Sequence, residues 1–347
     1  MIRFLDSNFS ALNHYLQQAP PTRIYILVDE HTHENCLPVL LANLETTIPF
    51  EVIEIEAGEE NKNIQTATQL WEILSEFHAD RHSLMLNLGG GVITDLGGFI
   101  ASTYKRGIKF INLPTSLLAM VDASIGGKTG INHQFYKNMI GTFTFPEKIF
   151  IFPEFLKTLA WEELRSGFAE MLKHGLIYSQ KHWEDLRNLE LNPQAISPYV
   201  EDSMKIKEAI VEQDFKEQNL RKTLNFGHTL GHAIESLFLQ NGNPIRHGEA
   251  IAAGMMMESH ISYSLQYLHE EDLKEITESI NRIFPLLDLS TLSFEDIFSV
   301  MLNDKKNSNG KIKFSLLQNI GKGIYDIEVS SDFIKEAIDY YKNLNQF

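Results

Sequence analysis

The chain has little cysteine and a shortage of positive charge. Cys36 is the single cysteine among 347 residues, which excludes an intrachain disulfide framework and any zinc or iron–sulfur site built from several cysteines. Its 30 Lys and Arg residues stand against 46 Asp and Glu, for a formal net charge of −16. Nucleic-acid binding needs a clustered basic face, and adsorption to an anionic membrane needs positive charge. We therefore expect neither a nucleic acid nor a membrane as a partner.

Long apolar runs are also missing. A membrane-spanning helix needs about 20 consecutive apolar residues, and the longest candidate, residues 110–121, is interrupted by Asn112, Pro114 and Thr115. The first ten residues have neither the basic region nor the apolar region of a secretory signal peptide. With 43% hydrophobic and 22% charged residues, the composition is that of an ordinary globular protein. We expect a cytoplasmic location.

The pattern of the sequence changes after about residue 155. Before that point, short runs rich in Ile, Val, Leu and Phe alternate with helical segments, which predicts βαβ units around a parallel sheet. These strands are expected at 23–29, 50–55, 84–88, 109–113 and 148–152, with a helix at 64–77. Later segments have helical periodicity, at 163–178, 198–214, 228–239 and 247–267, followed by a hairpin of 311–317 and 323–329. We predict an α/β domain at 1–155 and a mainly α-helical domain at 156–347, and the length also suggests two domains.

Two glycine clusters are candidates for phosphate binding. Residues 89–98 follow a predicted strand directly, and glycines at a strand-to-helix turn let backbone N–H groups approach a pyrophosphate. The spacing departs from the dinucleotide fingerprint because Thr94 stands where the third glycine belongs. A structural tight turn therefore stays open as the alternative. Residues 126–130 lack the first glycine of a nucleoside-triphosphate loop and follow a predicted helix, so they are a weak nucleotide site.

Histidines in the helical half indicate a metal site. His228 and His232 are four residues apart, which places both on one face of a helix, and His247 follows soon after. Imidazole nitrogen and carboxylate oxygen are ligands of zinc, and a catalytic site keeps one position open for substrate. Glu170 is a candidate carboxylate ligand, and Lys173 lies one turn further along the same helix face. The competing interpretation of each histidine is a hydrogen-bonded core residue.

Several basic residues lie in segments that are dense in Gly and Asn. Each one alone is most simply a solvated surface side chain. Together with a metal site and a nucleotide site, they suggest recognition of a small anion through charge-assisted hydrogen bonds. These residues are Arg106, Lys128, Lys137, Lys173, Lys207 and Arg221.

A set of long motifs resembles the 3-dehydroquinate synthase family. The resemblance spans about residues 23–325, and the motifs occur in the family's order. They are residues 89–98, 113–122, 124–132, 169–175, 224–232, 247–250 and 304–306. The resemblance implies an N-terminal Rossmann-like α/β domain, a mainly α-helical C-terminal domain and an active site in the cleft between them.

The same resemblance implies an activity and its cofactors. Members are typically homodimers that keep NAD+ bound and use one divalent metal, Zn2+ or Co2+. They convert 3-deoxy-D-arabino-heptulosonate 7-phosphate into 3-dehydroquinate and phosphate, the second step of the shikimate pathway to chorismate and the aromatic amino acids. Transient oxidation by NAD+ acidifies a C–H group, phosphate is eliminated, the hydride returns, and an intramolecular aldol reaction closes the ring. The cofactor carries out the hydride transfer, and the protein positions the reacting groups and supplies the electrostatic field around them.

The resemblance also assigns residues. It gives the metal to Glu170, His228 and His247, whereas spacing alone pairs His228 with His232. The substrate and phosphate residues are then Asp122, Lys128, Lys137, Asn138, Lys173, Lys207, Arg221, Asn225, His232 and Lys305, and Arg106 matches an arginine that reaches the phosphate across the dimer. The cofactor residues are Asp29, Glu59, Lys62, Gly90, Gly91, Val92, Asp95, Thr115, Ser116, Phe155 and Thr158, with Lys128 and Lys137 near the cofactor.

The sequence departs from the family pattern at four positions. Thr94 and Tyr136 each replace a usual glycine, Ser116 replaces a threonine, and Phe145 stands where glutamine is common. Ser116 keeps the hydroxyl group, so we expect little change there. Thr94 is expected to affect how closely the backbone meets the pyrophosphate, and so the affinity for the cofactor rather than its identity.

Three other functions stay open. A different sugar-phosphate cyclase, for example one acting on sedoheptulose 7-phosphate, would share the metal, the cofactor and the fold. A metal-dependent polyol dehydrogenase would accumulate NADH, which a cyclase does not. A nucleotide-binding protein without activity would have no use for so complete a set of ligands. Arg221, Asn225 and His232 favour the dehydroquinate reaction, because they match the family's substrate residues.

Overall fold

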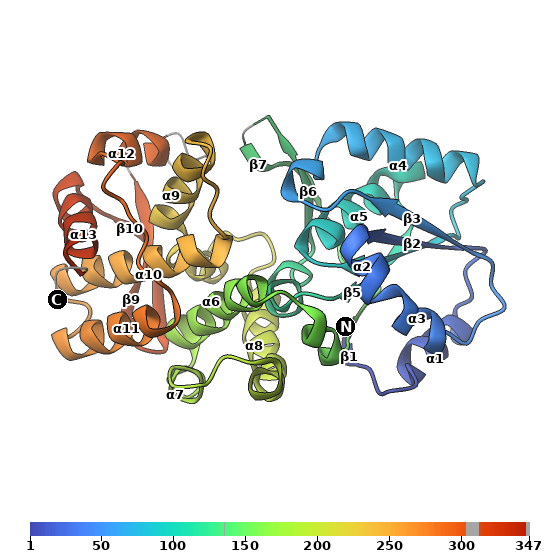
Figure 1. The fold of residues 1–347 in the computed structure, drawn as a ribbon, viewed down its shortest axis with the longest axis horizontal. Helices are drawn as coiled ribbons and strands as arrows, with labels where there is room; N and C mark the ends of the chain where they lie inside the picture. The colour runs from blue at the N-terminus through green and yellow to red at the C-terminus, as the bar shows by residue number, and fades with distance from the viewer. Residues whose placement is uncertain (135, 303–311, 345–347) are drawn as a thin grey trace. The chain divides into compact units, whose positions relative to one another are not determined.

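The computed structural model describes residues 1–134, 136–302 and 312–344. The chain divides into two compact units, Met1–Ala160 and Trp161–Phe347 (Figure 1). The boundary predicted after residue 155 falls within a short 3-10 helix, Pro153–Thr158, just before this division. No helix within the described residues is both long enough and apolar enough to span a membrane.

The first unit is built on a six-stranded sheet in which every pair of neighbouring strands is parallel. The strand order is β1-β8-β5-β4-β2-β3. The bounds are β1 Ile2–Phe4, β2 Ile24–Asp29, β3 Phe50–Ile55, β4 Leu84–Gly89, β5 Lys109–Pro114 and β8 Lys148–Ile151. The five predicted strands and the α/β class are confirmed. Strand β1 was not expected, because three residues are too few to show a period.

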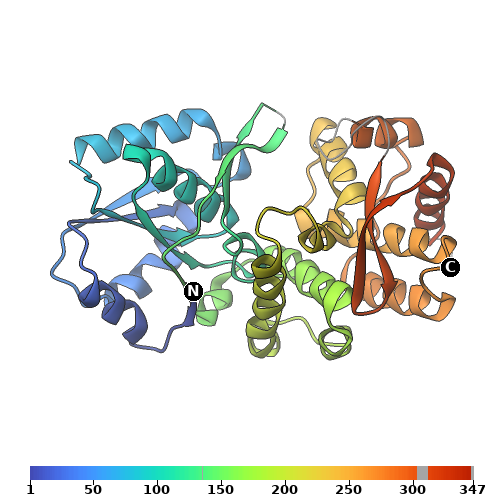
Figure 2. The same ribbon diagram turned by 180° about the vertical axis from the view of Figure 1, so that it is seen from behind.

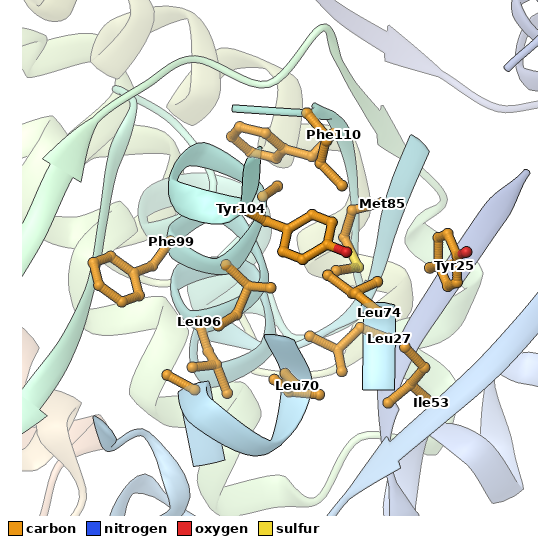
Figure 3. Packing of buried hydrophobic residues seen from close by; sticks show 14 of the residues in the cluster. Tyr25, Leu27, Ile53, Leu70, Leu74, Met85, Leu96, Phe99, Tyr104 and Phe110 are labelled. Carbon is orange, nitrogen blue, oxygen red and sulfur yellow. The ribbon is translucent and has the colours of Figure 1, made fainter. Parts of the chain in front are cut away.

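Helices cover both faces of this sheet, as the continuous apolar strands require. They are α1 Ser10–Gln18, α2 Glu30–Asn35, α3 Leu37–Asn43, α4 Ile64–Glu76 and α5 Gly91–Thr103. Alternate side chains of a strand point to opposite faces. Tyr25 and Leu27 of β2 therefore share one face, where they form a core with Leu70 of α4 and Leu96 of α5 (Figure 3). The first unit thus has a helix–sheet–helix arrangement, with a core on the α4 and α5 side.

A β-hairpin projects from the first unit, where the sequence showed only a glycine cluster. It comprises β6 Lys128–His133 and β7 Tyr136–Phe143, which pair antiparallel. Hydroxyl groups join its two strands and connect it to α5: Thr142 Oγ1 of β7 lies 2.7 Å from Thr129 Oγ1 of β6 and 2.8 Å from Ser102 Oγ of α5. The hairpin was missed because its strands are rich in Gly, Asn and Thr and lack a clear alternation of apolar and polar residues.

The second unit is mainly helical, as predicted. Its helices are α6 Trp161–Tyr178, α7 Gln180–Leu186, α8 Pro193–Gln213, α9 His228–Gln240, α10 His247–Ser264, α11 Glu270–Ile283, α12 Phe294–Leu302 and α13 Ser331–Asn343. The predicted hairpin is present as β9 Lys313–Asn319 and β10 Lys322–Glu328 (Figure 2). Helix α10 is buried along most of its length, between α6, α9, α11 and α13. It is therefore the central element of the unit.

Helix α8 begins earlier than expected. The prediction started it at Pro198, a residue that favours the first turn of a helix. The structure starts it at Pro193, where the Asn192 side chain accepts a hydrogen bond from Ala195 N at 2.9 Å. Pro198 then lies inside the helix, where it removes one backbone hydrogen bond. The Asn-Pro cap, which the prediction did not use, sets the true start.

Helices α9 and α10 approach each other closely because Gly254 has no side chain. A Cβ atom at residue 254 would overlap the carbonyl oxygen of Gly227, the residue that precedes α9. Gly227 itself has φ 79°, a left-handed conformation that favours glycine. The two backbones therefore meet next to the first residue of α9, His228.

We expect Gly254→Ala to destabilise the protein, although alanine normally favours a helix over glycine by about 1 kcal/mol. The added methyl group forces the two helices apart, and overpacking costs roughly 1–3 kcal/mol. The thermal unfolding midpoint should therefore fall. Gly91→Ala is the matched control, since a Cβ there has its nearest neighbour, Ala123 Cβ, at 3.5 Å. An equal midpoint for the wild type and Gly254→Ala would contradict the packing argument.

Candidate functional site

In the first unit, the turn between β4 and α5 has the geometry of a phosphate-binding turn. Gly89 ends β4, Gly90 precedes the helix and Gly91 is its first residue. Gly91 does not have positive φ, and a Cβ there would make only an ordinary contact. The fold itself thus tolerates a side chain at residue 91. Packing therefore does not explain why residue 91 is glycine. Close approach of a ligand to the helix N-terminus does explain it.

Thr94 does not block this turn. Its side-chain hydroxyl donates to the carbonyl oxygens of Gly90 at 3.3 Å and Gly91 at 3.2 Å, and the residue is buried. The side chain thus folds back on its own helix. Ser116, at the end of the neighbouring strand β5, uses its hydroxyl to accept a hydrogen bond from Ala119 N at 3.2 Å. Both departures from the family pattern are accommodated locally.

Other predicted cofactor residues lie at the same carboxyl edge of the sheet. Strand register places Gly89 beside Pro114, so Thr115 and Ser116 follow directly at the turn, and Thr115 N donates to Gly89 O at 3.0 Å. Asp29 ends β2, and its carboxylate accepts a hydrogen bond from Thr32 N at 2.8 Å, capping α2. The carboxyl ends of parallel strands are where α/β proteins bind ligands.

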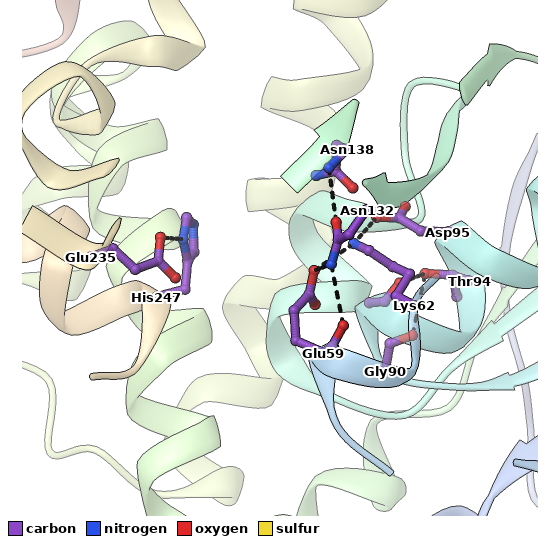
Figure 4. A network of polar contacts seen from close by, with 10 residues as sticks. Glu59, Lys62, Gly90, Thr94, Asp95, Asn132, Asn138, Glu235 and His247 are labelled. Atoms are coloured by element: carbon purple, nitrogen blue, oxygen red, sulfur yellow. Dashed lines mark hydrogen bonds and ion pairs between the residues drawn. The ribbon is translucent and has the colours of Figure 1, made fainter. Parts of the chain in front are cut away.

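Lys62 is the centre of a buried ion-pair network in the first unit (Figure 4). The side chain is 4% exposed, and its Nζ lies 3.0 Å from Glu59 Oε1 and 3.1 Å from Asp95 Oδ2. Burial alone would lower the pKa of Lys62, but the two carboxylates outweigh it and hold the pKa above its usual value. The lysine is therefore charged, and it links the segment 59–62 to helix α5.

Asn132, which was not predicted, extends this network to the hairpin. Its side-chain amide donates to Glu59 Oε1 at 2.9 Å, and its side-chain oxygen accepts a hydrogen bond from Asn138 N at 2.9 Å (Figure 4). Asn138 has φ 51°, a conformation that asparagine tolerates better than most residues. The turn of the hairpin is thus held by a cofactor candidate, Glu59. The clue available in the sequence was the position of Asn132 at the end of the motif 124–132.

The remaining predicted residues of the first unit lie at its surface or in short connections. Arg106 is exposed and has φ 68°. Phe155 is buried and accepts a hydrogen bond through its carbonyl from Thr158 Oγ1 at 3.3 Å. Lys128 and Lys137 are exposed on the two strands of the hairpin, whereas Val92 in α5 and Asp122 in the π-helical turn Ala119–Ala123 are half-buried.

In the second unit, three helices bring Glu170, His228 and His247 together. Glu170 Oε1 of α6 lies 3.5 Å from His228 Nε2 and 3.5 Å from His247 Nε2, and Glu170 is fully buried. A tetrahedral zinc ion with bonds of about 2.0–2.2 Å places its donor atoms roughly 3.4 Å apart. The carboxylate oxygen therefore lies at the separation of a fellow metal ligand from each of the two histidine nitrogens.

His232 belongs to the same cluster. The ring centroids of His228 and His232 are 5.0 Å apart, and those of His232 and His247 are 5.8 Å apart. The ligand nitrogens of His228, His232 and His247 all lie within 4.8 Å of one another. Both the pair expected from spacing and the set implied by resemblance are thus brought together. The carboxylate contacts of His228 and His247 favour Glu170 over His232 as the third ligand.

His228 and His247 have opposite charge preferences. Burial, followed by the charge of Lys173, lowers the pKa of His228 well below its usual value. Burial also acts to lower the pKa of His247, but bonds to Glu170 and Glu235 raise it to about 10. Without a metal, His247 is therefore the protonated ring, and it must lose that proton to become a ligand.

Within the described residues, the second unit contains three buried cations, and one of them contacts this cluster. Lys173 Nζ forms an ion pair with Glu170 and is 1% exposed. Lys207 of α8 and Arg221 are also buried, and Arg221 Nη1 donates to Phe215 O at 2.7 Å. Asn225 Nδ2 donates to Glu217 Oε1 at 2.7 Å, a carboxylate that sequence reasoning missed. Lys305 lies outside the described residues.

Two further buried carboxylates were missed. Glu235 of α9 faces His247, and Glu258 of α10 accepts hydrogen bonds from Gly227 N at 2.6 Å and Leu230 N at 3.1 Å. Glu258 therefore satisfies N–H groups at the start of α9, next to His228. Glu235 follows His228 by seven residues on the same helix face, a spacing that the sequence analysis did not use, whereas only the packing of α9 on α10 reveals Glu258.

Comparison with known proteins identifies the family of the chain. The model of the 3-dehydroquinate synthase N-terminal family matches residues 52–166, and that of the 3-dehydroquinate synthase C-terminal family matches residues 167–307. A 3-dehydroquinate synthase from Parabacteroides distasonis is 41% identical over 336 residues, covering 96% of this chain and 95% of its own. One from Leptospira interrogans is 38% identical over 345 residues, covering 98% and 95%.

Solved structures share the fold. A 2-deoxy-scyllo-inosose synthase, in complex with carbaglucose-6-phosphate, NAD+ and Co2+, has a TM-score of 0.85 at 24% identity and covers 98% of this chain and 96% of its own. A 2-epi-5-epi-valiolone synthase from Streptomyces hygroscopicus, with NAD+ and Zn2+ bound, has a TM-score of 0.84 at 24% identity, covering 99% and 97%. Two consecutive family models and relatives at about 40% identity over nearly the whole chain decide the assignment: this chain belongs to the 3-dehydroquinate synthase family.

Proposed function

We propose that the chain converts 3-deoxy-D-arabino-heptulosonate 7-phosphate into 3-dehydroquinate and phosphate, as a carbon–oxygen lyase of the shikimate pathway. Family membership supports this activity. The single structural observation that carries it is the placement of Glu170 Oε1 at 3.5 Å from the Nε2 atoms of both His228 and His247. A hydroxyl group of a sugar phosphate is a suitable further ligand for a metal held by these atoms.

Glu170, His228 and His247 are the residues proposed to hold a divalent metal, Zn2+ or Co2+. Their donor types suit either ion, because imidazole nitrogen and carboxylate oxygen are ligands that both accept. When bound, the metal would supply Lewis-acid polarisation of the substrate oxygen, and NAD+ would supply a reversible hydride acceptor. His228 Nδ1 donates to Phe226 O at 3.0 Å, which directs its Nε2 atom toward Glu170.

The turn at Gly90 and Gly91 is the proposed site for the pyrophosphate of NAD+. It combines the end of a strand, the N-terminus of a helix and a glycine that leaves space for a ligand to approach the backbone. Asp29, Thr115 and Ser116 lie at the same edge of the sheet, and Glu59, Lys62 and Asp95 form the adjoining network. Val92, Phe155 and Thr158 complete the proposed cofactor residues.

Buried cations of the second unit are proposed to bind the anionic groups of the substrate. Lys173, Lys207 and Arg221 are each 6% exposed or less. Phosphate and carboxylate groups form strong charge-assisted hydrogen bonds with lysine and arginine, so they are favourable ligands there. Asn225 and His232 are proposed to face the same substrate, as are Asp122, Lys128, Lys137, Asn138 and Lys305. Loss of one such donor typically costs about 10²–10³ in rate.

The assembly and location of the enzyme are also proposals. Family membership supports a homodimer, in which Arg106 of one copy would reach the phosphate bound by the other. The scarcity of cysteine agrees with a cytoplasmic protein, because disulfides concentrate in oxidising compartments.

A phosphate-release assay with the heptulosonate phosphate tests the activity. We expect release of phosphate without net accumulation of NADH, and loss of activity with a chelator that added Zn2+ or Co2+ restores. Sedoheptulose 7-phosphate and a simple polyol are the comparison substrates. Faster turnover of sedoheptulose 7-phosphate would identify another cyclase, and NADH accumulation with the polyol would identify a dehydrogenase.

Two variants should separate the two cofactor sites. Glu170→Gln removes the charged oxygen shared by the histidines, so we expect it to lose bound metal and turnover but to keep NAD+ binding. Gly91→Val places a branched side chain at the turn, so we expect it to lose NAD+ binding but to keep the metal. Metal analysis and calorimetry with NAD+ measure the two properties. Glu162→Gln, an exposed change on α6, is the control. Full turnover by metal-free Glu170→Gln would refute the ligand assignment.

Metal binding should release a proton from His247. Its pKa of about 10 in the metal-free protein means that the ring is charged at neutral pH, and only the neutral ring is a ligand. The affinity for Zn2+ should therefore rise about tenfold per pH unit and level off as the pH approaches that value. Calorimetry in buffers of different ionisation enthalpy counts the protons. A binding enthalpy that is the same in every buffer would show that no proton leaves.

A further inference from the structure

Both ring nitrogens of His247 face carboxylates in the second unit. Nε2 lies 3.5 Å from Glu170 Oε1. Nδ1 lies 3.4 Å from Glu235 Oε2, and Figure 4 shows this second contact. Glu170 comes from α6 and Glu235 from α9, so the imidazole of α10 is held from two sides. One carboxylate is a proposed metal ligand, which leaves the other without a role in the proposed function.

His228 has the same arrangement with a different acceptor. Its Nε2 also lies 3.5 Å from Glu170 Oε1, and its Nδ1 lies 3.0 Å from the carbonyl oxygen of Phe226. In both rings, therefore, Nε2 faces the proposed metal position, and Nδ1 faces an oxygen that can accept a hydrogen bond from it. The Nδ1 partner differs in charge, since one is a neutral carbonyl and the other a carboxylate.

Glu235 is placed for this contact by the helix that carries the other histidines. His228, His232 and Glu235 are spaced i, i+4 and i+7 along α9, so they share one face of the helix. The Glu235 residue is 7% exposed. A carboxylate at this depth is costly to bury unless it accepts hydrogen bonds, and the Nδ1–H group of His247 is one such donor.

We propose that Glu235 is a positioning residue for the metal site. Its carboxylate accepts the Nδ1–H of His247, fixes the tautomer that leaves the Nε2 lone pair for the metal, and orients the ring. Carboxylates that hold a ligand histidine in this way raise its basicity, and their loss typically lowers metal affinity about 10–100-fold. The inference rests on the proposed function, because it requires that His247 binds metal.

Titration of the metal-free protein with Co2+ tests the proposal through the visible absorption of the bound ion. Glu235→Leu removes the acceptor with little change in size, and Glu235→Gln keeps an oxygen without the charge. We expect Co2+ affinity to fall about 10–100-fold in Glu235→Leu and by less in Glu235→Gln. The absorption spectrum should also change, because the ring orientation is no longer fixed.

Glu275→Leu and Glu275→Gln are matched controls. Glu275 Oε1 accepts a hydrogen bond from the ring nitrogen of Trp183 at 2.7 Å, so it makes the same kind of contact with an aromatic N–H group. These controls are expected to bind Co2+ as the wild type does. If Glu235→Leu fails to fold, as judged by circular dichroism, the Co2+ affinity of Glu235→Gln alone tests the proposal.

The outcomes separate this inference from the proposed function. The wild type must bind Co2+, and His247→Ala must abolish the absorption; failure of either removes the metal assignment and the inference together. If both hold, wild-type affinity and spectrum in the Glu235 variants would overturn the inference alone. An equal loss in the Glu275 controls would overturn it too, since the effect would then be one of general stability.

Discussion

The close approach of helices α9 and α10 is the constraint on which the chemistry of the second unit depends. It is possible because Gly254 has no side chain where the carbonyl oxygen of Gly227 meets α10. His228 and His247 are the first residues of the two helices, so bringing the helices together brings two imidazoles to one carboxylate. With helices further apart, Glu170 could contact one histidine but not both.

Buried charges around this contact alternate in sign. Lys173 pairs with Glu170, Glu170 contacts His247, and His247 contacts Glu235. Alternation limits the cost of burial, because each charge has an opposite neighbour. The first unit uses the same principle in a separate network, where Lys62 lies between Glu59 and Asp95. A net charge of −16 is therefore compatible with a small anionic substrate, because buried cations can bind it locally.

Local patterns predicted the elements whose periodicity is strong. The five main strands of the sheet and the helices around Glu170 and the histidines have clear apolar periods, and each was located within a few residues. The β6–β7 hairpin was missed, since its strands show no clear apolar alternation: Ile131 packs into the core of the first unit, while threonine hydroxyls make the contacts within the hairpin and to α5. Helix α8 was shortened, because a proline inside a helix looks like a helix start.

The sequence by itself determined the family, the order of the elements and the candidate ligands, because long motifs and periodic runs are local properties of the chain. It also placed His228 and His232 on one helix face, since a spacing of four residues implies this in any helix. Only the tertiary structure decided that Glu170 Oε1 lies equally far from His228 and His247, and that Glu235 faces the second nitrogen of His247. These contacts join residues of α6, α9 and α10. Helix packing creates them, and packing depends on small residues such as Gly254, whose role no local pattern reveals.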